Sequence, residues 1–379
     1  MEDDNLGVKK FGISTNSNTV FLVSVENENF TVEEYPCTEF GVHDLDGCYS
    51  FSLKDHIFFC AEKNVFGFNS TKQKGFKITK RMDVIRYGAA TVSLKEGAIV
   101  AGGKESDGKG IPELTDSCVL LRQEKNKLSV IKLNKLPMKV RYHTITKISD
   151  ETFIMCGGMN NKGHEANDVF FGTLVKYSPS DVDSNVRQFS AHFSNRKQQN
   201  LFDRKNKSEG WTVEWTRLPK MWEWRSNHFA MFTNNRFYVF GGGPRRTEKQ
   251  HLKELNLKYC GFDMGLFAGT KAEVLGIKIE DHKVYCANKF QTIHDMAYDV
   301  SFADVVLSPD EKYCVVTGGE MYGDAEKKSE DTYLTMSTKN LVLRALGDKD
   351  PIPEDDSLFT NNLWKTILTC NCLTPMSDD

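Results

Sequence analysis

This chain of 379 residues has no large excess of positive or negative charge, since its formal net charge is −3. Proteins that bind nucleic acid or anionic membranes over a broad surface need a basic excess, so both partners are disfavoured. No apolar run reaches the roughly 20 residues of a membrane-spanning helix. The chain starts Met1-Glu2-Asp3-Asp4, without the basic and apolar regions of a signal peptide. We therefore expect a protein that is not secreted, located in the cytoplasm or, alternatively, in the nucleus.

Clustered cysteines are missing as well. The ten cysteines stand mostly alone in apolar runs, as in Phe58-Phe59-Cys60, which is typical of buried thiols and not of a disulfide framework. Cys370-Asn371-Cys372 has no second pair to complete a tetrahedral metal site, and the nine histidines show no metal-ligand spacing. We expect no metal and no cofactor.

Motifs of catalysis are also missing. The sequence contains neither His-Glu-x-x-His nor Gly-x-Ser-x-Gly. The segment 103–109 matches most of a phosphate-binding loop, but Gly110 stands where a magnesium-binding Ser or Thr is required, and Ile111-Pro112 follows in place of a helix. We therefore predict that the chain is not an enzyme, and we assign no catalytic residue.

A short repeat is what the sequence does contain. Four diglycines follow short apolar runs: Gly102 and Gly103, Gly157 and Gly158, Gly241 and Gly242, and Gly318 and Gly319. An arginine stands sixteen residues before the first glycine of the first three pairs, at Arg86, Arg141 and Arg225, and Phe302 takes this place in the fourth. Each segment has two β-forming runs joined by polar turn residues, which predicts a β-hairpin. The diglycine predicts a tight bend or the close approach of another backbone.

Two further strand-like runs follow each diglycine, such as 274–279 and 283–286, and give a unit of four strands. Two copies close on a Leu-Pro pair before the next arginine, at Leu136-Pro137 and Leu218-Pro219. An arginine-led strand, a diglycine strand and two more strands ending in Leu-Pro resemble the kelch repeat. The resemblance covers nearly the whole chain, strongly in three copies. It implies an all-β fold, a six-bladed kelch-type β-propeller with four antiparallel strands in each blade.

The predicted blades divide a single domain, residues 1–379. Five of them cover 45–82, 86–137, 141–219, 225–293 and 299–346, and two loop inserts cover 179–209 and 244–272. The sixth blade is shared between the termini: three runs within 11–35 lack a partner strand, which Leu363–Leu368 in the segment 363–372 supplies. This pairing of N-terminal strands with a C-terminal strand closes the ring and removes unpaired strand edges.

The resemblance also implies a binding site. In kelch domains that bind acidic peptides, the arginine that opens the innermost strand lines the pocket around the central channel, so Arg86, Arg141 and Arg225 would contact a partner. Trp222 and Trp224 precede Arg225 and belong to a residue type that is enriched at interface hot spots. The alternative is structural: each arginine pins one blade to its neighbour, and at least one tryptophan packs between blades.

We therefore predict a protein–protein interaction module that binds a partner protein or peptide, through an acidic extended segment, on the loop face around the central channel. Kelch domains often serve as substrate receptors of ubiquitin ligases or bind actin, so a substrate-recognition or scaffold subunit is implied. The alternative function is a kelch-fold enzyme that acts on a small molecule at the channel mouth. The basic and aromatic residues of the insert 179–209 either contact nucleic acid or an acidic partner, or belong to a solvated loop.

Overall fold

The computed structural model contains strands, turns and bends but no helix in the part of the chain that it describes. None of these residues thus belongs to a helix long and apolar enough to span a bilayer. The structure describes residues 9–14, 19–26, 29–36, 49–124 (without 55, 62, 70, 79–81, 83–84 and 107–109), 127–177, 210–242, 271–295 (without 281–282), 299–307, 313–322, 336–337, 341–344 and 372–375. Most of both predicted inserts, 179–209 and 244–272, lies outside these ranges.

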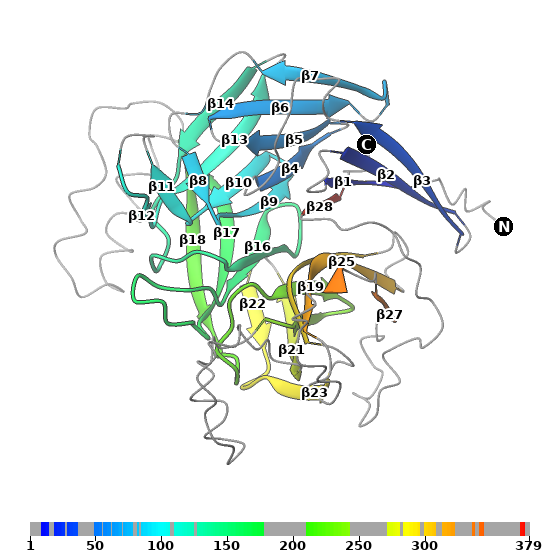
Figure 1. The fold of residues 1–379 in the computed structure, drawn as a ribbon. Helices are drawn as coiled ribbons and strands as arrows, with labels where there is room; N and C mark the ends of the chain where they lie inside the picture. Colours follow the sequence, from blue (N-terminus) through cyan, green and yellow to red (C-terminus); the bar gives the residue numbers. More distant parts are fainter. Residues whose placement is uncertain are drawn as a thin grey trace, which may run out of the picture.

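Antiparallel sheets, most of them of four strands, make up the molecule (Figure 1). The sheet β4-β5-β6-β7 consists of Tyr49–Leu53, His56–Ala61, Asn64–Asn69 and Lys74–Ile78. The sheet β9-β10-β13-β14 consists of Ala90–Leu94, Gly97–Ala101, Cys118–Glu124 and Lys127–Lys132. The sheet β15-β16-β17-β18 consists of Thr144–Lys147, Thr152–Cys156, Val169–Tyr177 and Gly210–Leu218.

The next sheet, β19-β20-β21-β22, consists of Phe229–Thr233, Arg236–Phe240, Lys271–Glu280 and Lys283–Cys286, and a fifth strand, β23 (Gln291–Asp295), pairs with β21. In the sheet after it, β25 (Tyr313–Tyr322) pairs with β24 (Asp299–Leu307), β26 (Met336–Ser337) and β27 (Leu341–Arg344). A small sheet is formed by β8 (Ile85–Tyr87), β11 (Lys104–Ser106) and β12 (Glu113–Leu114).

The two ends of the chain share one sheet, in the order β28-β1-β2-β3. Its strands are β1 (Lys9–Ser14), β2 (Thr19–Glu26), β3 (Asn29–Pro36) and β28 (Cys372–Pro375), and Figure 1 shows β28 beside β1. The C-terminal strand in this sheet is thus 372–375 and not the predicted Leu363–Leu368, which lies outside the described residues. The sequence prediction placed this strand too early because it relied on the apolar pattern of 363–368 alone to identify the partner of the N-terminal strands.

The core lies between neighbouring sheets, because the inner strands are buried on both faces. In β10, Ala98 and Val100 pack toward the sheet of β4 to β7, whereas Ile99 and Ala101 pack toward the sheet of β15 to β18. Successive side chains of a strand point to opposite faces, so one strand serves two cores. Strand β16 repeats this arrangement: Phe153 and Met155 belong to one cluster, and Ile154 and Cys156 to the next. This face-to-face packing of four-stranded sheets is a β-propeller-like fold.

The first three diglycines have left-handed backbone at both positions, with φ between 58° and 96°. At Gly157, a Cβ atom would lie 2.7 Å from the carbonyl oxygen of Arg225, which belongs to the following sheet's arginine segment. The neighbouring amide, Gly158 N–H, donates a hydrogen bond to that same carbonyl (2.7 Å), and Gly103 N–H donates likewise to Val140 (2.8 Å). Both predicted roles of the diglycine, the bend and the close backbone contact, are confirmed at these three sites. Gly318 and Gly319 instead lie within β25.

We predict that truncation after residue 371, which removes β28, lowers the melting temperature. The backbone pairing of 11–14 with 372–375 is then lost, and β1 becomes an unpaired edge strand. Truncation after residue 375 keeps β28 and is the matched control. Circular dichroism melts of both proteins test this, and equal melting temperatures would show that the pairing contributes nothing to stability.

Candidate functional site

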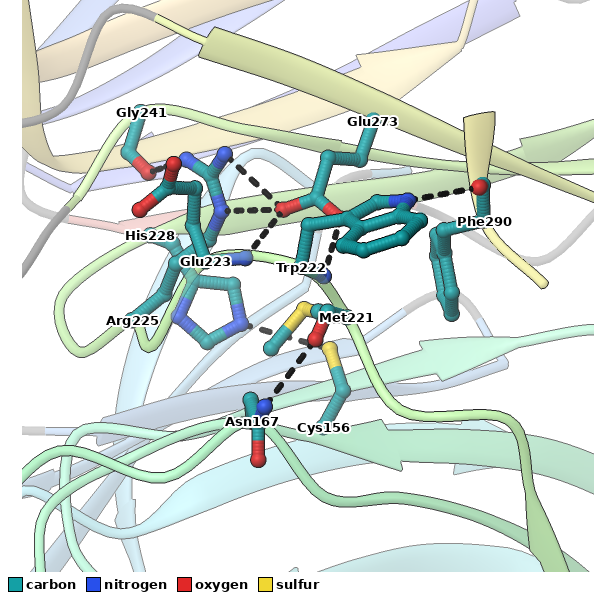
Figure 2. Close-up of polar contacts among 10 residues, drawn as sticks. All are labelled: Cys156, Asn167, Met221, Trp222, Glu223, Arg225, His228, Gly241, Glu273 and Phe290. Atoms are coloured by element: carbon teal, nitrogen blue, oxygen red, sulfur yellow. Dashed lines mark hydrogen bonds and ion pairs between the residues drawn. The ribbon is translucent and has the colours of Figure 1, made fainter. Parts of the chain in front are cut away.

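Arg225 and Glu273 form an ion pair that is completely buried, with 0% of either side chain exposed. The guanidinium donates from Nε (3.2 Å) and Nη2 (3.1 Å) to Glu273 Oε1, and from Nη1 to the carbonyl oxygen of Gly241 (2.6 Å) (Figure 2). The Glu273 carboxylate also accepts the backbone N–H groups of Trp222 (2.6 Å) and Glu223 (3.1 Å). One buried carboxylate therefore holds both the arginine and the loop that precedes it.

Arg86 is held in a similar way in the small sheet. Its Nη2 lies 2.6 Å from Glu105 Oε1 and 2.7 Å from Ser117 Oγ, and the side chain is 3% exposed. Arg86 and Arg225 thus occupy structural positions, but these side-chain partners lie within their own repeats, 86–137 and 225–293, so they do not pin one blade to its neighbour as the alternative interpretation expected. Neither opens an innermost strand: Arg86 lies in β8, and Arg225 pairs with Ala166 in an isolated bridge before β19.

Arg141 differs from these two arginines. It is half-buried, its Nε is buried without a hydrogen-bond partner, and it has no carboxylate partner in the described part of the chain. Its Nη2 lies 3.5 Å from Met159 Sδ, a weak acceptor, and its guanidinium carbon lies 4.7 Å from the centre of the Tyr142 ring. Of the three predicted binding arginines, Arg141 alone is partly exposed and has no carboxylate partner within the described ranges.

Both predicted tryptophans face solvent. Trp222 is 60% exposed and Trp224 is 55% exposed, so the expectation that at least one packs between sheets is wrong. Trp222 is nevertheless fixed at two points: its indole N–H donates to the carbonyl oxygen of Phe290 (2.7 Å), and its backbone N–H donates to Glu273 (Figure 2). The loop presents this large apolar ring in a defined orientation.

Thr144, Cys156 and His228 form a buried polar cluster beneath the arginine segment. Cys156 Sγ lies 3.2 Å from His228 Nε2, and Thr144 Oγ1 lies 3.1 Å from both of these atoms. Burial raises the pKa of Cys156 to about 12 and lowers the pKa of His228 to about 3. The thiol is therefore protonated and the imidazole neutral near pH 7, so this pair is not an activated cysteine nucleophile.

The sequence did not identify two carboxylates of this site, Glu105 and Glu273. Glu105 follows its diglycine by two residues, whereas Glu273 comes after the insert 244–272, so their spacing from the arginines differs. A shared spacing was the signal that identified the arginines. Without it, only the folded chain identifies the carboxylates.

Comparisons with known proteins support the fold and do not name a family. No protein-family model matches the chain, and no curated protein matches it. One similar solved structure, described as the structure of YjhT, has a TM-score of 0.55 and 10% sequence identity over 85% of this chain and 93% of that chain. Another is a fungal alcohol oxidase in complex with copper, with a TM-score of 0.46 and 11% identity over 97% of this chain and 61% of that chain. Identities this low show a shared fold alone.

The prediction that the chain is not an enzyme requires correction. It rested on missing sequence motifs alone, and the fold that the chain shares with the structure of YjhT does not support excluding catalysis. Missing motifs do not exclude catalysis on such a fold, because catalytic groups come from loops that lie far apart in sequence. The described residues contain no group of three or more His, Cys, Asp or Glu side chains that could hold a metal ion, so we derive no step through copper.

We predict that Glu273→Gln lowers the free energy of unfolding by about 3–5 kcal/mol, because it leaves the buried Arg225 charge without a counterion. The double variant Glu273→Met/Arg225→Met removes both charges and should recover most of this loss. Urea unfolding followed by circular dichroism measures both effects, and Glu214→Gln on the surface of β18 is the control. A Glu273→Gln protein as stable as the wild type would refute the structural role of this carboxylate.

We also predict that acid destabilises the protein through His143 and His228, whose pKa values burial lowers to about 3. Unfolded histidines titrate near pH 6.5, so the unfolded state binds more protons between these values, and stability falls as pH decreases from about 6.5 toward 3. His143→Leu should reduce the stability lost between pH 7 and pH 5 by about 2 kcal/mol. Urea unfolding at both pH values tests this against His164→Leu, which alters an exposed histidine. Equal losses in wild type and His143→Leu would contradict the prediction.

Proposed function

We propose that the chain is a closed six-bladed propeller of the kelch type that binds a partner protein on the face carrying Trp222 and Trp224. Six larger sheets, one of which joins the two ends of the chain, support the ring. The similarity in fold to the structure of YjhT is in line with it. Roles in ubiquitin ligases or in actin binding, and the cytoplasmic or nuclear location, stay predictions.

The exposed but fixed indole of Trp222 carries this proposal. A side chain that is already immobilised loses little conformational entropy on binding, and tryptophans dominate interface hot spots. Glu273 and Phe290 hold Trp222 before any partner arrives. Trp224, two residues further along the same loop, is also exposed.

We expect the variant Trp222→Ala/Trp224→Ala to keep its fold and to lose its main partner, because both side chains are largely exposed. Affinity purification with mass spectrometry compares this variant with the wild type, and circular dichroism confirms folding. Tyr285→Ala, which removes another exposed aromatic residue (52% exposed), is the matched control. If the tryptophan variant captures the same partners as the wild type, the surface is not the binding site.

The second candidate function is catalysis on a small molecule at the arginine side of the sheets. The half-buried guanidinium of Arg141, which has no carboxylate partner in the part of the chain that the structure describes, favours it, because arginine recognises anionic ligands. Incubation of the full chain with a panel of small organic anions, followed by NMR of each mixture, tests this function, since the protein consumes a substrate but returns a binding ligand unchanged.

A further inference from the structure

A pocket with a volume of about 400 Å³ lies beside the small sheet of β8, β11 and β12, whose strands Figure 1 shows next to one another. Glu105 of β11 and Glu113 of β12 line it, together with Gly110 and Ile111 from the segment between these strands and Lys139 from the segment after β14. Binding sites for small molecules begin at about 300 Å³, so this pocket has room for a small ligand.

Two carboxylates stand opposite each other on one wall of the pocket. Glu105 and Glu113 are direct cross-strand partners in the register of β11 and β12. Like charges directly opposite each other destabilise a strand pair. Arg86 Nη2 lies 2.6 Å from Glu105 Oε1, whereas Glu113 is exposed and has no ion-pair partner among the described residues. One arginine thus serves two carboxylates, and a cationic group in the pocket would reduce the repulsion between them.

Lys139 brings a positive charge to the same pocket. Its side chain is exposed, and within the described ranges it has no ion-pair partner. Lys139 and Glu113 could neutralise each other, but they do not form an ion pair although both line the pocket. The pocket therefore presents an ammonium group and a carboxylate group that are apart from each other and both available to a ligand.

Ile111 adds an apolar element to this lining. It is 90% exposed, the highest value among the exposed large hydrophobic residues of the described part of the chain. Contact with an apolar ligand group would remove this surface from water, which is favourable.

We propose that this pocket binds a small zwitterion with an apolar side chain, which is either a free amino acid or a dipeptide. The ligand's ammonium group lies between Glu105 and Glu113, its carboxylate contacts Lys139, and its apolar side chain lies on Ile111. Hydrogen bonds between charged groups are the stronger ones, so both ends of the ligand contribute to affinity.

The two carboxylates also exclude another class of ligand. They repel a phosphate group, although the segment 103–109 next to the pocket matches most of a phosphate-binding loop. The site is separate from the tryptophan surface of the proposed function and does not depend on it.

The experiment measures binding to the full chain at low salt, by ligand-detected NMR and thermal shift. The probes are leucine and leucyl-leucine, and binding of one or the other distinguishes a free amino acid from a dipeptide. We expect at least one of them to bind the wild type. Its C-terminal amide, which lacks the carboxylate, and its N-acetyl form, which lacks the ammonium group, should each bind about tenfold more weakly. Inorganic phosphate should not bind.

Two variants assign the ends of the ligand. Glu113→Gln and Lys139→Met should each weaken binding of the zwitterion by about tenfold. In Lys139→Met the probe and its amide should bind equally, because the lysine that distinguishes them is absent. Glu214→Gln and Lys127→Met remove exposed charges outside the pocket and are the matched controls.

A third variant fills the pocket without altering its charge. A Cβ atom at Gly110 would meet no atom within 4 Å, so the fold accepts Gly110→Phe, and its ring should block binding. Gly276→Phe, at an equally open position in β21, is the control. Circular dichroism confirms that each variant is folded.

The proposal is overturned if neither probe binds the wild type, if the amide or the N-acetyl form binds as tightly as the zwitterion, or if Glu113→Gln, Lys139→Met or Gly110→Phe binds as the wild type does. Trp222→Ala/Trp224→Ala should bind the zwitterion normally. Failure of this proposal and failure of the partner surface are therefore distinguishable.

Discussion

The close contact between a diglycine and the arginine segment of the following sheet is the constraint on which this molecule depends. At Gly157 and Gly158, a side chain on either residue would collide with a backbone carbonyl of Arg225 or Arg141, and Gly158 N–H donates to the Arg225 carbonyl. Gly103 makes the same bond to Val140 one sheet earlier. The sheets of β9 to β14 and of β15 to β18 are thereby each placed against the next sheet by backbone geometry, which leaves little freedom in their spacing.

Because these contacts fix how neighbouring sheets are placed, a single inner strand contributes side chains to two hydrophobic cores. Strand β10 directs Ala98 and Val100 to one side and Ile99 and Ala101 to the other, and all four are buried. Such a strand has no polar face, so it is stable only with a sheet packed on each side. The diglycine bonds and the two-sided burial therefore depend on each other.

Charge is distributed around this scaffold in two ways. The buried carboxylate of Glu273 neutralises Arg225 and fixes the backbone of the loop that presents Trp222, so one structural ion pair also prepares an exposed surface. The segment of Arg141 has the same origin in the repeat, but its side chain has no carboxylate partner among the described residues. In the described part of the chain, the repeated arginine is thus paired with a carboxylate at two of the three positions.

The sequence by itself determined the all-β fold, the hairpins that end in diglycines, and the positions of the arginines. These features follow from local chemistry: the continuous apolar run in a strand such as 97–101, the φ values that glycine allows, and a constant spacing of sixteen residues. Only the tertiary structure decided that Glu273 pairs with Arg225, that Trp222 stays exposed, and that 372–375 pairs with β1. Each of these depends on residues brought together across long stretches of chain, at separations that no local pattern encodes. The left-handed backbone of Tyr142 belongs with them, because its hydrogen-bond partners Gly88 and Asn227 come from the segments that lead into other sheets.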